Sequence, residues 1–197
     1  MHITQPQAQH ALAYVWAIFG IYWVSSAVHT KNAKTTEFPG WRVLRWGILG
    51  LTFALLFASW MRIGFLGLRF TPIRSVIYQS GFIATLAGIT LAFWARLHLG
   101  QNWSDKVVLK VGHELVRSGP YAYFRHPIYS GVLLGVAGSA MVVGEWRGVI
   151  AFCMLLVNYA IKARKEEKIL SVQFGEAFEL HKREAGFLLP KLRSKAS

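Results

Sequence analysis

Five apolar stretches, separated by short polar segments, run along the chain. They lie near 8–28, 43–61, 76–95, 127–143 and 148–163. The first three are about 18 to 20 residues long, the length that a helix needs to cross a hydrocarbon core of roughly 30 Å, and the last two are shorter. Inside a bilayer a backbone must satisfy its own hydrogen bonds, and a helix does this within one segment. The pattern therefore predicts an all-α integral membrane protein with about five transmembrane helices.

The last stretch continues as a helical pattern beyond its apolar part. Leu170, Phe174, Ala177 and Phe178 recur at helical spacing and give one apolar face. We expect this helix to project from the bilayer and to lay its apolar face on the polar loop that precedes the fourth stretch. Gly175 marks a bend or a break in the helix.

Small residues and a proline set two further expectations. Gly81, Ala84 and Gly88 have the spacing that favours close contact between membrane helices. Pro127 suits the first turn of a helix, where its missing N–H would be unpaired anyway. The helix that begins there presents unpaired N–H groups and the positive end of its dipole, which suit a carboxylate or a phosphate.

The distribution of charge predicts an orientation in the membrane. The chain has 197 residues, of which 54% are apolar, and a formal net charge of +13. The basic residues flank the spans, so contact with anionic lipid explains the charge better than nucleic acid does. With the N-terminus outside, all Lys and Arg residues fall inside except Arg62, Arg69, Arg74 and Arg147. We expect a protein of a prokaryotic inner or plasma membrane, with its N-terminus outside and its C-terminus cytoplasmic.

A change in composition near Arg96 divides the chain within a single domain overall. Residues 1–95 are predicted to form three N-terminal scaffold helices. Residues 96–190 hold the predicted catalytic region, which consists of a cytoplasmic loop, helices four and five and a C-terminal helix. Residues 191–197 are predicted to form a disordered basic tail.

Two polar clusters meet at the predicted cytoplasmic mouth. One is the loop from His113 to Tyr129, which holds most of the motif GPYAYFRHPIYSG (119–131), and the other is the helix end from Lys162 to Glu167. Taken alone, the loop cluster supplies residues that anchor the chain at the membrane interface. Taken alone, the helix end is a salt-bridged surface with Lys162 and Glu166 at i,i+4. Taken together, they offer a helix N-terminus and an Arg–His pair for an anion, carboxylates for hydroxyls or a cation, and aromatic faces for a cation.

S-adenosylmethionine is one ligand that needs all of these groups, because it carries a carboxylate, an ammonium, a ribose diol and a sulfonium. A metal site is the competing interpretation. The histidines lack the close spacings of a zinc or iron site, so we expect no metal. The chain also has no Gly-rich phosphate loop and no strand–helix alternation, which excludes a Rossmann-type methyltransferase or dehydrogenase.

Two segments resemble the signature of the isoprenylcysteine carboxyl methyltransferase family, which includes membrane phospholipid N-methyltransferases. They are LVRSGPYAYFRHPIYSG (115–131) and EEKILSVQFGEAFELH (166–181). Together they hold the pattern R-H-P-x-Y-x-G, an E-E pair and a downstream F-G. The resemblance covers roughly residues 98–190 and is to a short member of prokaryotic type.

The resemblance implies an all-α multispan enzyme, a methyltransferase that encloses S-adenosylmethionine at the cytoplasmic face. A lipophilic or small acceptor would enter from the bilayer. The residues expected at the cofactor are His113, Glu114, Leu115, Val116, Tyr121, Arg125, His126, Pro127, Ile128, Tyr129 and Glu166.

On the acceptor side, the resemblance places Lys162 where the family has an Arg, with Arg164 nearby. For a carboxylate acceptor such as isoprenylcysteine, which is the most family-like, Lys162 or Arg164 would hold the anion. For a lipid amine or a thiol, Glu167 or His181 would take the proton. The expected catalytic residues are therefore Lys162, Arg164 and Glu167. After the F-G the family commonly has two Tyr, whereas this chain has Phe178 and His181.

Two other function classes stay open. A membrane reductase of a related fold would use NADPH, although such enzymes usually need more spans and a larger nucleotide cradle. A non-catalytic lipid-binding membrane protein would use the motif residues as anchors.

Overall fold

The computed structural model describes residues 4–27, 39–100 and 115–191. Within these ranges the chain forms helices and turns, with two isolated β-bridges. The long helices are α1 (Gln5–Ala27), α2 (Pro39–Phe57), α3 (Ser75–Leu99), α4 (Pro127–Val143) and α5 (Trp146–Phe174), and α6 (Glu176–Glu184) follows. The short 3-10 helices are η1 (Ser59–Met61), η2 (Gly64–Gly67) and η4 (Gly119–Ala122).

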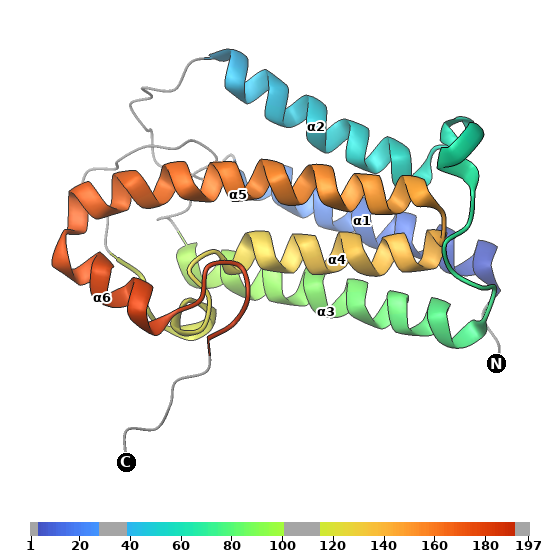
Figure 1. Ribbon diagram of the computed structural model, residues 1–197. Helices are drawn as coiled ribbons and strands as arrows, with labels where there is room; N and C mark the ends of the chain where they lie inside the picture. The colour runs from blue at the N-terminus through green and yellow to red at the C-terminus, as the bar shows by residue number, and fades with distance from the viewer. Residues whose placement is uncertain (1–3, 28–38, 101–114, 192–197) are drawn as a thin grey trace.

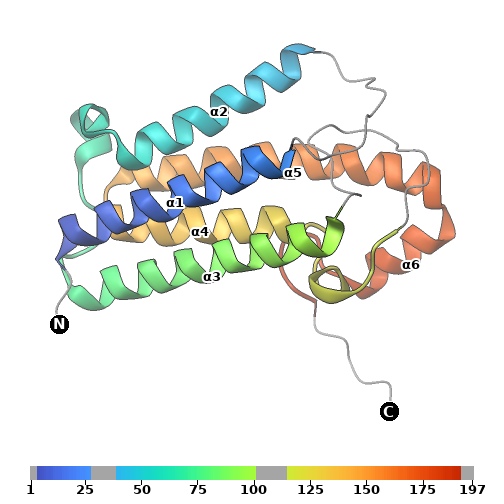
Figure 2. The ribbon, with the colours of Figure 1, turned by 180° about the vertical axis from the view of Figure 1, so that it is seen from behind.

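The helices α1, α3, α4 and α5 run side by side, and α2 lies on α5 (Figures 1 and 2). In both views α2 approaches α5 near its C-terminal end and diverges from it toward its N-terminal end. Helix α6 packs at the far end of α5, next to η4. This arrangement confirms the predicted all-α class.

The five long helices lie where the five spans were predicted. Among the described residues, three are long and apolar enough to cross a membrane, namely Gly40–Phe57, Ser75–Leu99 and Trp146–Phe174. Helix α4 is apolar but shorter, with 17 residues. Helix α1 has 23 residues, and Gln5, Gln7, Gln9 and His10 in its first turns lower its hydropathy. The chain is an all-α membrane protein.

Glycines bring α3 and α4 into backbone contact, as the small-residue spacing predicts. A Cβ atom on Gly81 would lie 2.6 Å from the carbonyl oxygen of Gly138. A Cβ on Gly88 would collide with the backbone of Gly131 and Gly135. Larger residues would push the helices apart, so these positions fix the distance between α3 and α4.

A buried polar network fastens α1 to this helix pair. The indole nitrogen of Trp16 donates to the hydroxyl of Ser139 over 2.9 Å. The Ser139 hydroxyl donates to the carbonyl of Gly135 over 2.9 Å and lies 3.3 Å from the hydroxyl of Thr85. Because polar groups among membrane helices need internal partners, this network sets the rotation of α1.

A second polar cluster holds the end of the bundle opposite α6. Glu145 and Arg147 are buried, and Nε of Arg147 donates to Oε2 of Glu145 over 2.7 Å. Nη1 of Arg147 donates to the carbonyl oxygens of Leu55 and Ala58, over 2.7 and 3.1 Å. Arg62 adds a 2.8 Å ion pair to Glu145. The C-terminal end of α2 is thereby tied to the start of α5.

Helix α5 continues past its apolar part for 29 residues in all, as the periodicity predicts. It ends at Gly175, whose φ of 49° is the conformation that glycine adopts without strain. Helix α6 then turns back, and Phe178 is buried at 1% exposure. The break at Gly175 is confirmed, but of the four residues of the predicted apolar face only Phe178 is buried: Leu170 and Phe174 are half-buried and Ala177 is exposed. Of the predicted basic tail, all but Lys191 lies outside the described residues.

Candidate functional site

The polar cluster of the site forms where α4 begins and the second half of α5 passes by. Pro127 occupies the first turn of α4, as predicted, and His126 is its N-cap residue. No side chain caps this end of the helix. The backbone N–H groups of the first turn are therefore available to a ligand, and the helix dipole adds positive potential there.

Arg125 joins three elements at this point. Its Nε donates to Oε1 of Glu167 over 2.6 Å. Its Nη1 donates to the carbonyl oxygens of Ala185 and Lys182, over 2.6 and 3.2 Å. The guanidinium also lies 5.5 Å from the ring centre of Phe187. Arg125 therefore fastens α6 and the segment after it to α5.

His126 lies between the two carboxylates of the E-E pair. Its Nε2 is 3.2 Å from Oε1 of Glu167, and its Nδ1 is 3.6 Å from Oε2 of Glu166. Its ring stacks on Tyr129 at 5.6 Å and meets the edge of Phe187 at 5.4 Å. These contacts fix the plane of the imidazole.

Tyr129 links this cluster to the middle of α5. Its hydroxyl donates to Oε1 of Glu166 over 2.7 Å, and its ring stacks on Tyr159 at 4.7 Å. Nζ of Lys162 lies 5.5 Å from the centre of the Tyr129 ring and 3.9 Å from Oε1 of Glu166. The predicted i,i+4 pair of Lys162 and Glu166 is thus present, but it is buried within the cluster rather than on a solvated surface.

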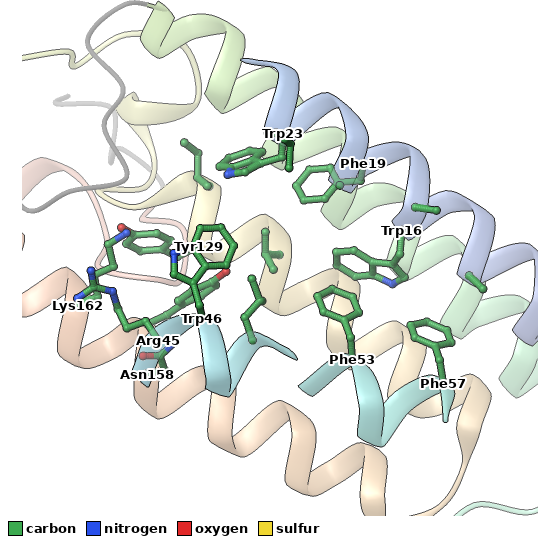
Figure 3. Close-up of a pocket in the computed structure, with 18 residues that line it drawn as sticks. Trp16, Phe19, Trp23, Arg45, Trp46, Phe53, Phe57, Tyr129, Asn158 and Lys162 are labelled. Carbon is green, nitrogen blue, oxygen red and sulfur yellow. The ribbon is translucent and has the colours of Figure 1, made fainter. Parts of the chain in front are cut away.

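A cavity of about 490 Å³ adjoins the polar cluster (Figure 3). Its wall comes from α1, α2, α4 and α5, and most of its lining is aromatic or aliphatic. Arg45, Tyr129, Asn158 and Lys162 lie at one end of the view, whereas Trp16, Phe53 and Phe57 lie at the other. The cavity thus has a polar end at the carboxylate cluster and an apolar body between the helices.

Three other predicted cofactor residues, Val116, Tyr121 and Ile128, lie beside α3. Tyr121 and Ile128 are buried against Ala95, and Val116 packs on them. Burial raises the pKa of the Tyr121 phenol, so it stays protonated. Leu115, which precedes Val116 in the chain, is half-buried. Ile128 also contributes to the cavity wall.

The remaining predicted residues are placed differently. Arg164 is exposed on α5 and is not among the residues that line the cavity. Glu167 accepts from Arg125 and His126 through a single carboxylate oxygen. His113 and Glu114 lie outside the described residues. The structure therefore brings together Arg125, His126, Tyr129, Lys162, Glu166 and Glu167.

His181, predicted as an alternative base, is buried on α6 at 3% exposure. Burial lowers the pKa of its imidazole, and the nearby charges of Arg125 and Arg117 lower it further. Its ring lies 6.3 Å from that of Phe178. These two residues pack α6 against the bundle at the positions where the family commonly has Tyr.

Several residues of the site escaped sequence reasoning. Asn158 and Tyr159 share one face of α5 with the predicted Lys162, so helical spacing upstream of the E-E pair was the available signal. Phe187 lies within the predicted catalytic region, but no motif marked it. Arg45 lies on α2, and nothing in the sequence placed it at the same end of the cavity as Lys162.

Comparison with known proteins shows that one segment of the chain is similar to a known family. The model described as the isoprenylcysteine carboxyl methyltransferase (ICMT) family matches residues 81–172. The chain is 30% identical over 118 residues to the Protein-S-isoprenylcysteine O-methyltransferase of Schizosaccharomyces pombe, which covers 58% of this chain and 50% of that protein. It is 27% identical over 95 residues to the uncharacterized protein YpbQ of Bacillus subtilis, which covers 46% of this chain and 55% of that protein.

The chain therefore spans about half the length of the curated relatives that it matches. The matched residues include most of α3, all of α4 and nearly all of α5, and so both halves of the polar cluster. The resemblance found in the motifs is confirmed over residues 81–172, which match the model of the isoprenylcysteine carboxyl methyltransferase family, whereas the F-G at 174–175 lies beyond the matched segment.

Proposed function

We propose that this chain is a membrane methyltransferase that uses S-adenosylmethionine and acts on a lipophilic acceptor. One observation carries the proposal. Tyr129 and Lys162 belong both to the carboxylate cluster and to the wall of the apolar cavity. A polar place for a methyl donor and an apolar place for an acceptor thus share a boundary.

The donor set of the cluster fits S-adenosylmethionine. The uncapped N-terminus of α4 suits its carboxylate. The carboxylates of Glu166 and Glu167 suit its ammonium and ribose hydroxyls, and the stacked aromatic rings of His126, Tyr129 and Tyr159 give a sulfonium an aromatic surrounding. These residues would hold the cofactor, which supplies a methyl carbon already activated by a positive sulfur.

The protein's own contribution is then alignment and the exclusion of water. Tyr129 is fixed from two sides, by Glu166 and by the ring of Tyr159. Lys162 is held beside Tyr129 with its ammonium buried. In this proposal Tyr129 and Lys162 position the acceptor's reacting atom, and the aromatic lining keeps water out.

The cluster favours a carboxylate acceptor over an amine or a thiol. A carboxylate needs no base, and the ammonium of Lys162 provides a counter-charge for it. An amine or a thiol needs a proton acceptor, but Oε1 of Glu167 is already engaged by Arg125 and His126. The relative from Schizosaccharomyces pombe is named for an isoprenylcysteine O-methyl transfer, in keeping with an oxygen acceptor. Arg164, being exposed, is proposed to stay outside the reaction.

Ligand binding tests the proposal against the two other classes. Calorimetry on the detergent-solubilised protein would compare S-adenosylhomocysteine with NADPH. We expect binding of the first only, and a loss of affinity of about tenfold or more in Glu166→Gln, because a charge-assisted contact is removed. Glu179→Gln, on the exposed face of α6, is the matched control.

Each other result contradicts the proposal in its own way. Binding of NADPH alone would favour a reductase, and binding of neither nucleotide would favour a lipid-binding protein without catalysis. Transfer of a labelled methyl group into a total membrane extract, followed by chromatography, would then identify the acceptor.

A further inference from the structure

We infer that α1 and α2 select the acceptor, with Arg45 binding its anionic head and the Trp16–Phe53 ring pair limiting its chain length. The inference rests on the proposed function, and it concerns residues outside the matched segment 81–172. It assigns to this chain an acceptor that is an amphiphile with one anionic head and an apolar chain of medium length.

The polar end of the cavity carries two positive charges from two helices. Among its lining residues in the described part of the chain, the charged ones are Arg45 of α2 and Lys162 of α5. Figure 3 shows both at the same end, with the amide of Asn158 and the ring of Tyr129 beside them. An anionic head that enters this end would meet two cations and an amide.

Arg45 is the stronger determinant of the two cations. A guanidinium presents two parallel N–H groups that match the two oxygens of a carboxylate, whereas an ammonium acts as a point charge. Removing Arg45 should therefore weaken binding of a carboxylate far more than binding of an uncharged head.

The apolar end of the cavity is a fixed aromatic wall. Trp16 is 5% exposed, and its bond to Ser139 prevents the indole from turning aside. The edge of its ring meets Phe53 of α2 at 5.0 Å, and Phe53 stacks on Phe57 at 6.3 Å. An acceptor chain that runs along the cavity from its polar end therefore meets a rigid obstacle at this ring pair.

The distance between the two ends is set by α2 itself. From Arg45 to Phe53 the helix rises about 12 Å, at about 1.5 Å per residue. Helix α2 is fastened to α5 near its C-terminal end, where Arg147 donates to the carbonyl of Leu55; toward its N-terminal end, where the two helices diverge, Lys165 still lies over the ring face of Trp41 at 4.2 Å. The separation between Arg45 and the Trp16–Phe53 ring pair is therefore fixed, and the cavity limits the length of the acceptor's apolar chain.

Fluorescence quenching tests the head contact without requiring methyl transfer. A terminally brominated dodecanoate would be titrated into the detergent-solubilised protein, because its bromine quenches nearby indoles and Trp16 lines the far end. We expect saturable quenching that Trp16→Phe largely removes. In Arg45→Gln the affinity should fall about tenfold or more, the usual effect of losing a charged hydrogen bond. Brominated dodecanol should bind Arg45→Gln and the wild type alike.

Arg42→Gln is the matched control, because Arg42 is an exposed residue of the same helix that does not line the cavity. We expect it to bind the probe like the wild type. The inference is overturned if Arg45→Gln binds the brominated dodecanoate as tightly as Arg42→Gln does. It is equally overturned if the wild type shows no saturable quenching.

Chain length is tested by competition against the same probe with octanoate, dodecanoate and hexadecanoate. The wild type should prefer dodecanoate to hexadecanoate, and Phe53→Ala should reverse or abolish that preference. Phe65→Ala, which removes an exposed ring stacked on Trp146, should leave it unchanged. Phe53→Leu provides a milder variant if Phe53→Ala fails to fold. An unaltered preference in the Phe53 variants contradicts the length limit.

These binding tests separate the inference from the proposed function. If the protein binds the amphiphiles as expected but no methyl group is transferred, the proposed function fails and the selecting role of α1 and α2 holds. If methyl transfer occurs but Arg45→Gln and Phe53→Ala leave the choice of acceptor unchanged, the inference fails alone.

Discussion

The hydroxyl of Tyr129 donates a 2.7 Å hydrogen bond to Glu166, and this bond joins the start of α4 to the second half of α5. Both residues belong to the motifs that resemble the family, and they lie 37 positions apart in the chain. Tyr129 also faces the apolar cavity, so the bond connects the charged cluster with the proposed acceptor space.

The first prediction concerns this bond. Tyr129→Phe keeps the ring and its stack on Tyr159 but leaves a carboxylate oxygen of Glu166 without its donor. We expect a loss of about 1–2 kcal/mol in the free energy of unfolding, and a weaker affinity for S-adenosylhomocysteine, because a charge-assisted bond is lost. Thermal unfolding and calorimetry measure the two effects. Tyr123→Phe, on an exposed side chain, should change neither.

The second prediction concerns Arg125 and the docking of α6. Arg125→Ala removes bonds to Glu167 and to the carbonyl oxygens of Lys182 and Ala185. We expect local destabilisation of about 2–4 kcal/mol, because Glu167 also loses its counter-charge in a half-buried site. Arg125→Lys should rescue only part, since an ammonium cannot reproduce the fork of bonds.

Hydrogen exchange of residues 176–190 measures this effect. Faster exchange there, with unchanged protection in α3 and α4, is the expected pattern. Unchanged exchange in Arg125→Ala would show that Phe178 and Phe187 hold α6 without the guanidinium.

The third prediction follows from the lowered pKa of buried His181. In the unfolded chain the imidazole takes up its proton near its usual pKa of about 6.5, whereas the folded chain takes it up only at lower pH. The stability that neutral His181 contributes is therefore fully present above about pH 6.5. It is lost as the pH falls from there toward the pKa of His181 in the folded state. Exchange of α6, measured relative to the intrinsic rate of a free amide at each pH, should accelerate on acidification across this window.

A variant separates this titration from other acid effects. In His181→Gln the group that titrates is gone, so exchange of α6 should depend less on pH between neutrality and mild acid. An equal acid response in the variant and the wild type would assign the effect to another residue.

The fourth prediction concerns the polar cluster at the opposite end of the bundle. Glu145→Gln leaves Arg147 buried beside a neutral side chain, and it also breaks the ion pair with Arg62. We expect destabilisation of about 3–5 kcal/mol, the usual cost of an uncompensated buried charge. Glu176→Gln, on an exposed residue, is the control in the same thermal-unfolding measurement.

The fifth prediction concerns the contact between α3 and α4. Gly88→Ala places a methyl group against the backbone of Gly131 and Gly135. We expect a loss of about 1–3 kcal/mol in the free energy of unfolding, because the helices must separate to accept it. Gly50→Ala, where nothing lies within 4 Å of the added carbon, should be neutral or slightly stabilising.

The features that sequence reasoning predicted correctly are those with a local cause. Pro127 begins α4 because a proline fits a first helical turn, and Gly175 ends α5 because it adopts a φ of 49° without strain. Gly81 and Gly88 predicted close packing of α3 on a neighbouring helix, because glycine has no side chain to hold two backbones apart. The motifs likewise marked His126 and Glu166 as neighbours through their resemblance to a known family.

The cavity and its partners were not predictable in this way. Arg45 and Trp16 lie on helices without a recognisable motif, and their meeting with α5 depends on how α1 and α2 pack. In the sequence, Glu145 and Arg147 lie between the fourth and fifth apolar stretches. In the structure they are buried, because the end of α2 closes over them. Arg164 and Lys162 are two positions apart, and only the orientation of α5 decides which of them is buried.

By itself, the sequence determined the all-α class, the places of the long helices, the break at Gly175 and the family resemblance of residues 98–190. Each of these depends on hydrophobic periodicity, on backbone preference or on a short motif, all of which are local properties of the chain. The tertiary structure decided which charges are paired, which residues face the cavity, and that Tyr129 and Lys162 stand between its polar and apolar parts. Those relationships join side chains from separate helices, so they exist only once the helices are packed.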